Sequence, residues 1–165
     1  MKKLLFIALL SLTALWIAGQ TANVDSLVNV LETQKLTNRE QMDLYYKIYE
    51  VYVLYDIEKA SEYAQNGLII AEKEKDKTMA SKFHTAFGRI YNTKSDYDTA
   101  LIHWEKALDF AKSAKDEEQE AAIYQGIGIF YFRQQKYISA LDFFLKALSL
   151  NEKLGKKRQC QPSYE

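Results

Sequence analysis

Few residues have the types and spacing that catalysis or metal binding would need. The only two histidines are His84 and His103. His103 stands beside Trp104 with no carboxylate or cysteine at metal-ligand spacing, so we expect no metal site. The pattern Gly126-x-Gly128 lacks the strand and helix context of a nucleotide loop. No nucleophile is accompanied by a base and an orienting third group. The sequence therefore predicts neither an enzyme nor a cofactor.

Binding through aromatic and basic side chains is better supported. Tyr45, Tyr49 and Tyr52 lie at i, i+4 and i+7, where their rings and hydroxyls suit an extended chain. Arg89 and Arg133 are forked donors for carboxylates or phosphates. The competing interpretation is that the tyrosines pack against a neighbouring helix and that the arginines are solvated. The sequence leaves both interpretations open.

These side chains belong to a pattern that repeats every 40 residues. The later copy has the spine Tyr124-x2-Ile127-Gly128-x2-Tyr131, then Ala140-x3-Phe144-x2-Ala147-Leu148. The earlier copy has His84-x2-Phe87-Gly88-x2-Tyr91, then Ala100-x3-Trp104-x2-Ala107-Leu108. The spacing i, i+3, i+4, i+7 places residues on one helical face. Small residues facing large ones predict interlocking helical hairpins, and the two glycines predict the close approach of another backbone.

A third, worn copy precedes these two. Its second helix keeps Ala60, Ala64, Gly67, Leu68 and Ala71, which align with Ala100, Trp104, Ala107, Leu108 and Ala111. Its first helix has Ile48 in place of the motif glycine. Val28 lies one period before Leu68. Helical spacing is also found for Val24, Leu27, Val28 and Leu31, so the sequence predicts half a repeat here.

The spine resembles the tetratricopeptide repeat (TPR), whose pattern is W-x2-L-G-x2-Y followed by A-x3-F. The resemblance covers about residues 24 to 155. It implies an all-α fold, a right-handed α-solenoid of helix-turn-helix units whose period exceeds the roughly 34 residues of the standard repeat. About seven helices are expected: the half-repeat and the pairs 38–54 with 57–74, 77–93 with 97–114, and 117–134 with 137–154. Thr37-x-x-Glu40 predicts a capping box at the start of the first pair.

In the TPR family, the free faces of the first helices line a concave groove that holds peptide segments. The resemblance thus implies a non-catalytic protein-interaction scaffold that binds a peptide or partner helix. Carried over by position, the candidate groove consists of Met42, Tyr45, Tyr49, Tyr52, Lys82, Thr85, Arg89, Asn92, Gln125, Ile129, Phe132 and Arg133. The Lys and Asn arrangement that clamps a C-terminal carboxylate in some TPR proteins is not reproduced, so chaperone-tail binding is not implied.

The N-terminus has the layout of a secretory signal peptide. Met1-Lys2-Lys3 precedes the apolar run from Leu4 to Ala18, and the small residues Gly19 and Ala22 follow. The run is shorter than the roughly 20 apolar residues that span a bilayer. We expect residues 1–22 to be cleaved and the protein to be periplasmic or secreted; an uncleaved anchor is the alternative.

The expected mature chain is a single TPR domain over residues 23–155. It divides into a half-repeat, 23–36, and repeats at about 37–76, 77–116 and 117–155, with 156–165 as a frayed or truncated tail. The formal charge of zero becomes −2 once Lys2 and Lys3 are removed, which offers no electrostatic footprint for nucleic acid. The single Cys160 excludes an intrachain disulfide.

The last helix presents apolar residues with no predicted cover, namely Leu141, Leu145, Leu148 and Leu154. Solenoid ends need a polar cap. The chain is therefore interpreted as a fragment of a longer array, as a truncated gene product, or as an edge that self-associates or docks onto another protein.

The layout of signal, half-repeat and repeats is similar to the exported sensory segments of bacterial sensor histidine kinases and related helix-turn-helix regulators. A truncated extracytoplasmic sensory input domain is thus the alternative function. An exported hydrolase or carbohydrate-binding protein is a more distant one. Membrane association is expected only if the signal stays uncleaved or the chain belongs to a receptor.

Overall fold

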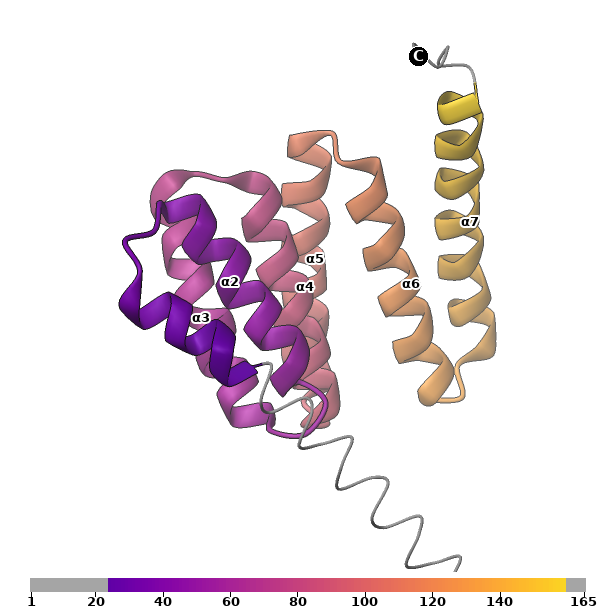
Figure 1. Cartoon of the computed structure of the whole chain (residues 1–165). Helices are drawn as coiled ribbons and strands as arrows, with labels where there is room; N and C mark the ends of the chain where they lie inside the picture. Colours follow the sequence, from indigo (N-terminus) through magenta and orange to yellow (C-terminus); the bar gives the residue numbers. More distant parts are fainter. Residues whose placement is uncertain (1–23, 160–165) are drawn as a thin grey trace, which may run out of the picture.

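Helices joined by short turns make up the structure (Figure 1). The computed structural model describes residues 24–159, and residues 24–33 form a first helical stretch. It is followed by α2 (Asn38–Tyr52), α3 (Ile57–Glu74), α4 (Lys77–Thr93), α5 (Tyr97–Ala114), α6 (Glu117–Arg133) and α7 (Tyr137–Gln159). The predicted helix pairs are confirmed, with differences at the C-terminal ends of α2, α6 and α7. The predicted signal peptide, residues 1–22, lies outside the described residues.

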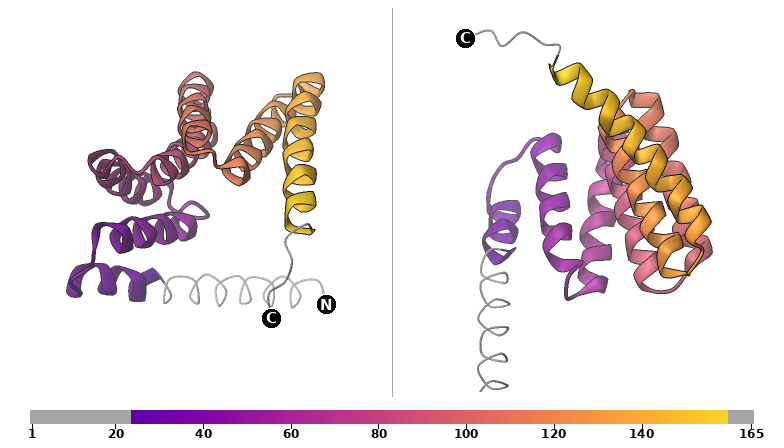
Figure 2. Two further views of the ribbon diagram at one scale, coloured as in Figure 1. Left: turned by 90° about the horizontal axis from the view of Figure 1, so that it is seen from above. Right: turned by 90° about the vertical axis from the view of Figure 1, so that its right-hand side faces the viewer.

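Consecutive helices pack as pairs. The most extensive contacts join α2 to α3, α4 to α5, and α6 to α7, and each pair also packs on the next. The first helices of the pairs are neighbours as well, because α4 contacts both α2 and α6. Figure 2 shows the pairs following one another along a curve. The fold is thus the predicted α-solenoid of helix-turn-helix units, in which α2, α4 and α6 are the first helices and α3, α5 and α7 the second helices.

Side-chain caps fix where the helices begin. Thr37 and Glu40 form the predicted capping box: Thr37 Oγ1 accepts from the Glu40 N–H at 3.3 Å, and the Glu40 carboxylate accepts from the Thr37 N–H at 2.8 Å. At four later starts an aspartate accepts from the N–H three residues on, at 2.9–3.2 Å; these are Asp56, Asp76, Asp96 and Asp116. Each cap satisfies a donor that the helix itself leaves unpaired.

The end of α7 differs from the prediction. The helices α3 and α5 stop at Lys75 and Lys115, whose φ angles of 56° and 58° are left-handed, and an N-cap aspartate follows each. Gly155 holds the equivalent position in α7 without a positive φ, and Lys156 follows instead of aspartate. The left-handed residue and following aspartate that end α3 and α5 are therefore not reproduced, and α7 continues through Gln159. The helix therefore extends over residues 156–159 of the predicted tail, and 160–165 lie outside the described residues.

The motif glycines make room for aromatic rings. A Cβ added at Gly88 would lie 2.5 Å from Trp104 Nε1, and one at Gly128 would lie 2.6 Å from Phe144 Cε1. The predicted approach of another backbone is wrong, because the second helix of each pair inserts a ring instead. The pairing of small with large residues holds, and it fixes how the two helices of a pair interlock.

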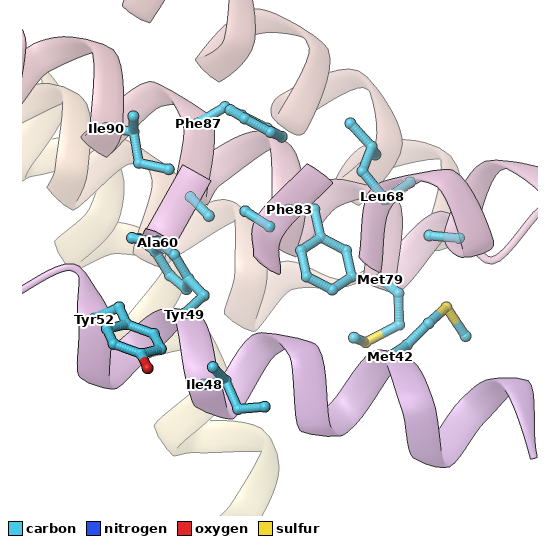
Figure 3. Packing of buried hydrophobic residues seen from close by; sticks show 14 of the residues in the cluster. Met42, Ile48, Tyr49, Tyr52, Ala60, Leu68, Met79, Phe83, Phe87 and Ile90 are labelled. Carbon is cyan, nitrogen blue, oxygen red and sulfur yellow. The ribbon is translucent and has the colours of Figure 1, made fainter. Parts of the chain in front are cut away.

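Two apolar clusters fill the solenoid. The first joins α2, α3 and α4, as Figure 3 shows for Met42, Ile48 and Phe83. Residues 24–33 contribute to it through buried Val24 and through partly buried Leu27, Val28 and Leu31. The second cluster surrounds Trp104 and joins α5 to α6. The chain from residue 24 to α7 is therefore one continuous stack.

Candidate functional site

Three predicted groove residues on α2 belong to the core instead. Met42, Tyr49 and Tyr52 are 2%, 0% and 6% exposed. Figure 3 shows them among apolar side chains, and the Tyr52 ring stacks on Tyr63 of α3 at a centroid distance of 5.5 Å. Their place in the groove is wrong, because these large side chains fill the space between α2 and its neighbours. The alternative of packing against a neighbouring helix is thus the correct one for Tyr49 and Tyr52.

The other nine candidates keep at least part of their surface in contact with solvent. Those that are exposed are Arg89, Gln125, Ile129, Phe132 and Arg133. Those that are half-buried are Tyr45, Lys82, Thr85 and Asn92. The candidates that remain in contact with solvent therefore lie on α4 and α6, and Tyr45 is the one that remains on α2.

Side chains of three helices meet around α4. Lys82 Nζ lies 5.7 Å from the ring centroid of Tyr46 on α2, a cation–π distance. Gln119 of α6 donates from Nε2 to Thr85 Oγ1 at 3.1 Å. We call Tyr46, Lys82, Thr85, Arg89 and Gln119 the inner surface. Tyr46 and Gln119 were not predicted to belong to it, because only the tertiary contacts of α4 single them out.

Arg89 is an exposed cation of the inner surface. None of the ion pairs within residues 24–155 includes it. Burial raises the pKa of both Tyr46 and Tyr49, and the positive charge of Arg89 opposes the rise in each. The positive charge of Arg89 therefore acts on both phenols, while its own side chain is exposed. An exposed guanidinium that belongs to none of these ion pairs suits a carboxylate or phosphate.

A chain of one buried and two part-buried hydrogen bonds holds this surface in place. Thr85 Oγ1, which accepts from Gln119, donates to the Ser81 carbonyl at 2.9 Å. Ser81 Oγ in turn donates to the Ala107 carbonyl of α5 at 2.8 Å. The chain connects α6, α4 and α5, so the polar face of α4 is set before any ligand arrives.

The two histidines meet, which their spacing did not predict. Their Nδ1 atoms are 3.0 Å apart, so one ring donates and the other accepts. The His84 ring also stacks on Phe110 at 5.5 Å, and the packing role predicted for His84 is confirmed. Burial lowers the pKa of His84 to about 4 and also lowers that of His103. Across the described residues no three His, Cys, Asp or Glu side chains are grouped to hold a metal ion.

The free face of α7 is apolar. Three of the four leucines predicted to lack cover are exposed: Leu141, Leu145 and Leu148. Leu154 instead lines a hollow with Thr78 and Ala114 of earlier helices. Ile138, which the prediction did not include, is 89% exposed. Within residues 24–159, no helix is both long and apolar enough to cross a membrane.

Comparison with known proteins supports the repeat assignment. A model of the tetratricopeptide repeat family matches residues 78–153, the last two helix pairs. The crystal structure of BtubC (BKLC) from P. vanneervenii is similar, with a TM-score of 0.63 and 16% sequence identity. The likeness covers 78% of this chain and 53% of BtubC, so this chain spans about half of that protein. At this identity the likeness shows the fold alone. Tetratricopeptide repeats generally mediate protein–protein interactions and are typically non-catalytic.

Proposed function

We propose that this chain is a non-catalytic scaffold that binds an acidic peptide or partner helix on the inner surface. The observation that carries the proposal is Arg89, an exposed guanidinium without an ion pair among the described residues, whose positive charge acts on the Tyr46 phenol. Lys82, about two turns earlier on the same helix, adds a second cation, and its ammonium group lies over the ring of Tyr46. An acidic segment that lies along α4 would therefore meet two cations and an aromatic face.

Neighbouring residues supply apolar and hydrogen-bonding contacts. Ile129 and Phe132 are 45% and 58% exposed on α6, next to α4 in the stack. Asn92, near the C-terminal end of α4, and Gln125, in the middle of α6, offer amide groups. A ligand that combines an acidic residue with apolar ones would therefore suit the surface. The Thr85 network fixes the relative position of the helices, which reduces the ordering cost of binding.

We further propose that the scaffold acts outside the cytoplasm. The proposal rests on the basic and apolar pattern of residues 1–22. A sensory input role within a larger membrane protein is the alternative, and it would use the same inner surface. The two are separated by the mass of the native protein in membrane and soluble extracts of its own cell, detected with an antibody to the repeats. A much larger membrane species supports the sensory role.

Peptide selection followed by charge reversal tests the binding proposal. Random dodecapeptides displayed on phage are selected on the protein, and the enriched ones are synthesised with a fluorescein label. Fluorescence anisotropy then gives Kd for wild type and for Arg89→Glu. We expect acidic peptides to be enriched and Arg89→Glu to raise Kd about tenfold or more, since a charged hydrogen bond contributes about 1.5–3 kcal/mol.

The matched control is Lys112→Glu, the same type of charge reversal at an exposed position of the second helix α5. It should leave Kd within about twofold, since a single distant surface charge is screened by salt. Circular dichroism confirms that both variants remain helical. Enrichment of neutral or basic peptides, or an equal loss of affinity in the two variants, would contradict the proposal.

A further inference from the structure

A continuous apolar stripe runs along the free side of α7. Ile138, Leu141, Leu145 and Leu148 are 89%, 58%, 54% and 52% exposed. Their spacing of i, i+3, i+7 and i+10 puts them on one helical face. We call these four residues the α7 stripe. Scattered apolar residues on a surface are ordinary, but a contiguous row of four marks a contact site.

Part of the α7 stripe follows from the repeat itself. Leu141 and Leu148 correspond to Leu101 and Leu108 of α5, one period earlier. Those two leucines pack in the second cluster, which contains Ile127 of α6. At these two positions α5 therefore offers apolar side chains to the helix that follows it, whereas α3 has Ser61 and Leu68 there.

The other half of the α7 stripe departs from the repeat. Ile138 corresponds to Asp98 and Glu58, which are polar and exposed. Leu145 corresponds to the polar, exposed Glu105 and Gln65. Continuation of the stack would require apolar residues at 141 and 148 only. The two additional replacements widen the apolar face beyond what a following helix of the same array contacts.

The α7 stripe is complementary to itself when reversed. Its four positions are symmetric about Phe143, so an antiparallel second copy would place Ile138 opposite Leu148 and Leu141 opposite Leu145. This is the arrangement of core layers in an antiparallel pair of helices and suits a two-fold axis. Asp142 and Lys146 form an ion pair of 2.7 Å within α7, so neighbouring charges are balanced. Two identical copies would therefore meet without net repulsion at this point.

We infer that the α7 stripe is a homodimer interface, with α7 packed antiparallel on α7 of a second copy. The interface lies on a different helix from the inner surface and does not depend on the proposed peptide binding. In the dimer each copy covers the apolar end of the other stack.

Sedimentation equilibrium of the whole purified chain between about 1 and 300 µM tests this inference. Wild type should form a reversible dimer. The variants Ile138→Asp and Leu145→Glu introduce the residue types that the preceding repeat carries, Asp98 and Glu105, so they are compatible with the fold. Each should raise the dimer dissociation constant about tenfold or more, because a charge would enter an apolar contact.

The matched control is Ile102→Asp on α5. Ile102 is 51% exposed, and the later repeat has Asp142 at that position. Its dimer dissociation constant should equal that of wild type. A wild type that stays monomeric up to about 300 µM would overturn the inference, and so would an equal loss in all three variants. A monomeric chain that instead binds an isolated amphipathic helix at the α7 stripe would also overturn it.

Mixing two variants tests the orientation. In the antiparallel arrangement, position 145 of one copy faces position 141 of the other. Leu145→Glu mixed with Leu141→Lys should therefore restore a dimer that contains one copy of each, because one layer joins the opposite charges and the other keeps two leucines. A mixture no more dimeric than the separate variants would refute the antiparallel arrangement.

Discussion

Gly88 provides the sharpest test of how each helix pair interlocks. In Gly88→Ala the new Cβ would lie 2.5–2.7 Å from Nε1, Cδ1 and Cε2 of Trp104. Carbon atoms in contact are usually about 3.5–4.0 Å apart, so the ring or α4 must move by about 1 Å. Trp104 has little freedom to do so, since it is 1% exposed and its ring contacts Phe130 edge-on at 5.1 Å.

Two opposing effects set the magnitude. Alanine is about 1 kcal/mol more favourable than glycine within a helix. Overpacking in a filled core costs about 1–3 kcal/mol. Because three ring atoms are met at once, the upper end of that range applies, and the net loss in Gly88→Ala is about 2 kcal/mol.

Gly126 on α6 is the matched control. A Cβ there would meet only Trp104 Nε1, at an ordinary 3.7 Å. Gly126→Ala should therefore stabilise the protein by about 1 kcal/mol through helix propensity alone. Urea denaturation followed by circular dichroism measures both variants. With a slope of about 2 kcal/mol/M, the midpoint falls by about 1 M in Gly88→Ala and rises by about 0.5 M in Gly126→Ala.

A second background tests the cause. Trp104→Leu removes the ring atoms that crowd Gly88, so adding Gly88→Ala to that variant should raise stability by about 1 kcal/mol rather than lower it. The reasoning fails if Gly88→Ala is as stable as wild type, or if it has the same effect in both backgrounds.

Two further predictions concern a helix cap and the histidine pair. Asp76→Ala should lower the free energy of unfolding by about 1 kcal/mol, because α4 loses its N-cap, and urea denaturation measures this loss. The folded-state pKa of His84 is about 4, below its unfolded value. The unfolded chain then binds more protons as the pH falls. The free energy of unfolding should therefore be highest above about pH 6.5 and decline as the pH falls towards 4. His84→Tyr, which copies Tyr124 of the next repeat, should weaken this decline in urea midpoints measured from pH 7 to 4.5. An unchanged slope would refute the assignment to His84.

Local signals made the fold predictable. The Thr37 capping box acts within three residues of the chain, and the structure forms it where the sequence predicted it. The aspartate caps, which we did not predict, are equally local signals. The motif glycines marked a close approach, although not that a ring makes it. We predicted too short an α7. The helices α3 and α5 end at a residue with left-handed φ that is followed by an N-cap aspartate, and of these two features Gly155 suggests only the first.

Side-chain contacts between helices were less predictable. Tyr49 and Arg89 occupy equivalent positions of successive first helices, yet one is buried and the other exposed. Which of the two faces solvent depends on side-chain size and on the neighbouring helices, and spacing along one helix specifies neither. The contact between His84 and His103 likewise depends on how α4 and α5 cross. The exposure of Ile138 was available from the sequence, since aligning it with Asp98 shows an apolar residue at a solvated position.

The most direct test of the proposed function is to locate a bound peptide on the protein. An enriched acidic dodecapeptide carrying a photoreactive group is bound and irradiated, and the cross-linked residues are identified by mass spectrometry. Binding at the inner surface predicts cross-links within residues 82–92 of α4 and 119–133 of α6, which are lost in Arg89→Glu. Cross-links that fall mainly on α3, α5 or α7, or that persist in Arg89→Glu, would contradict the proposal.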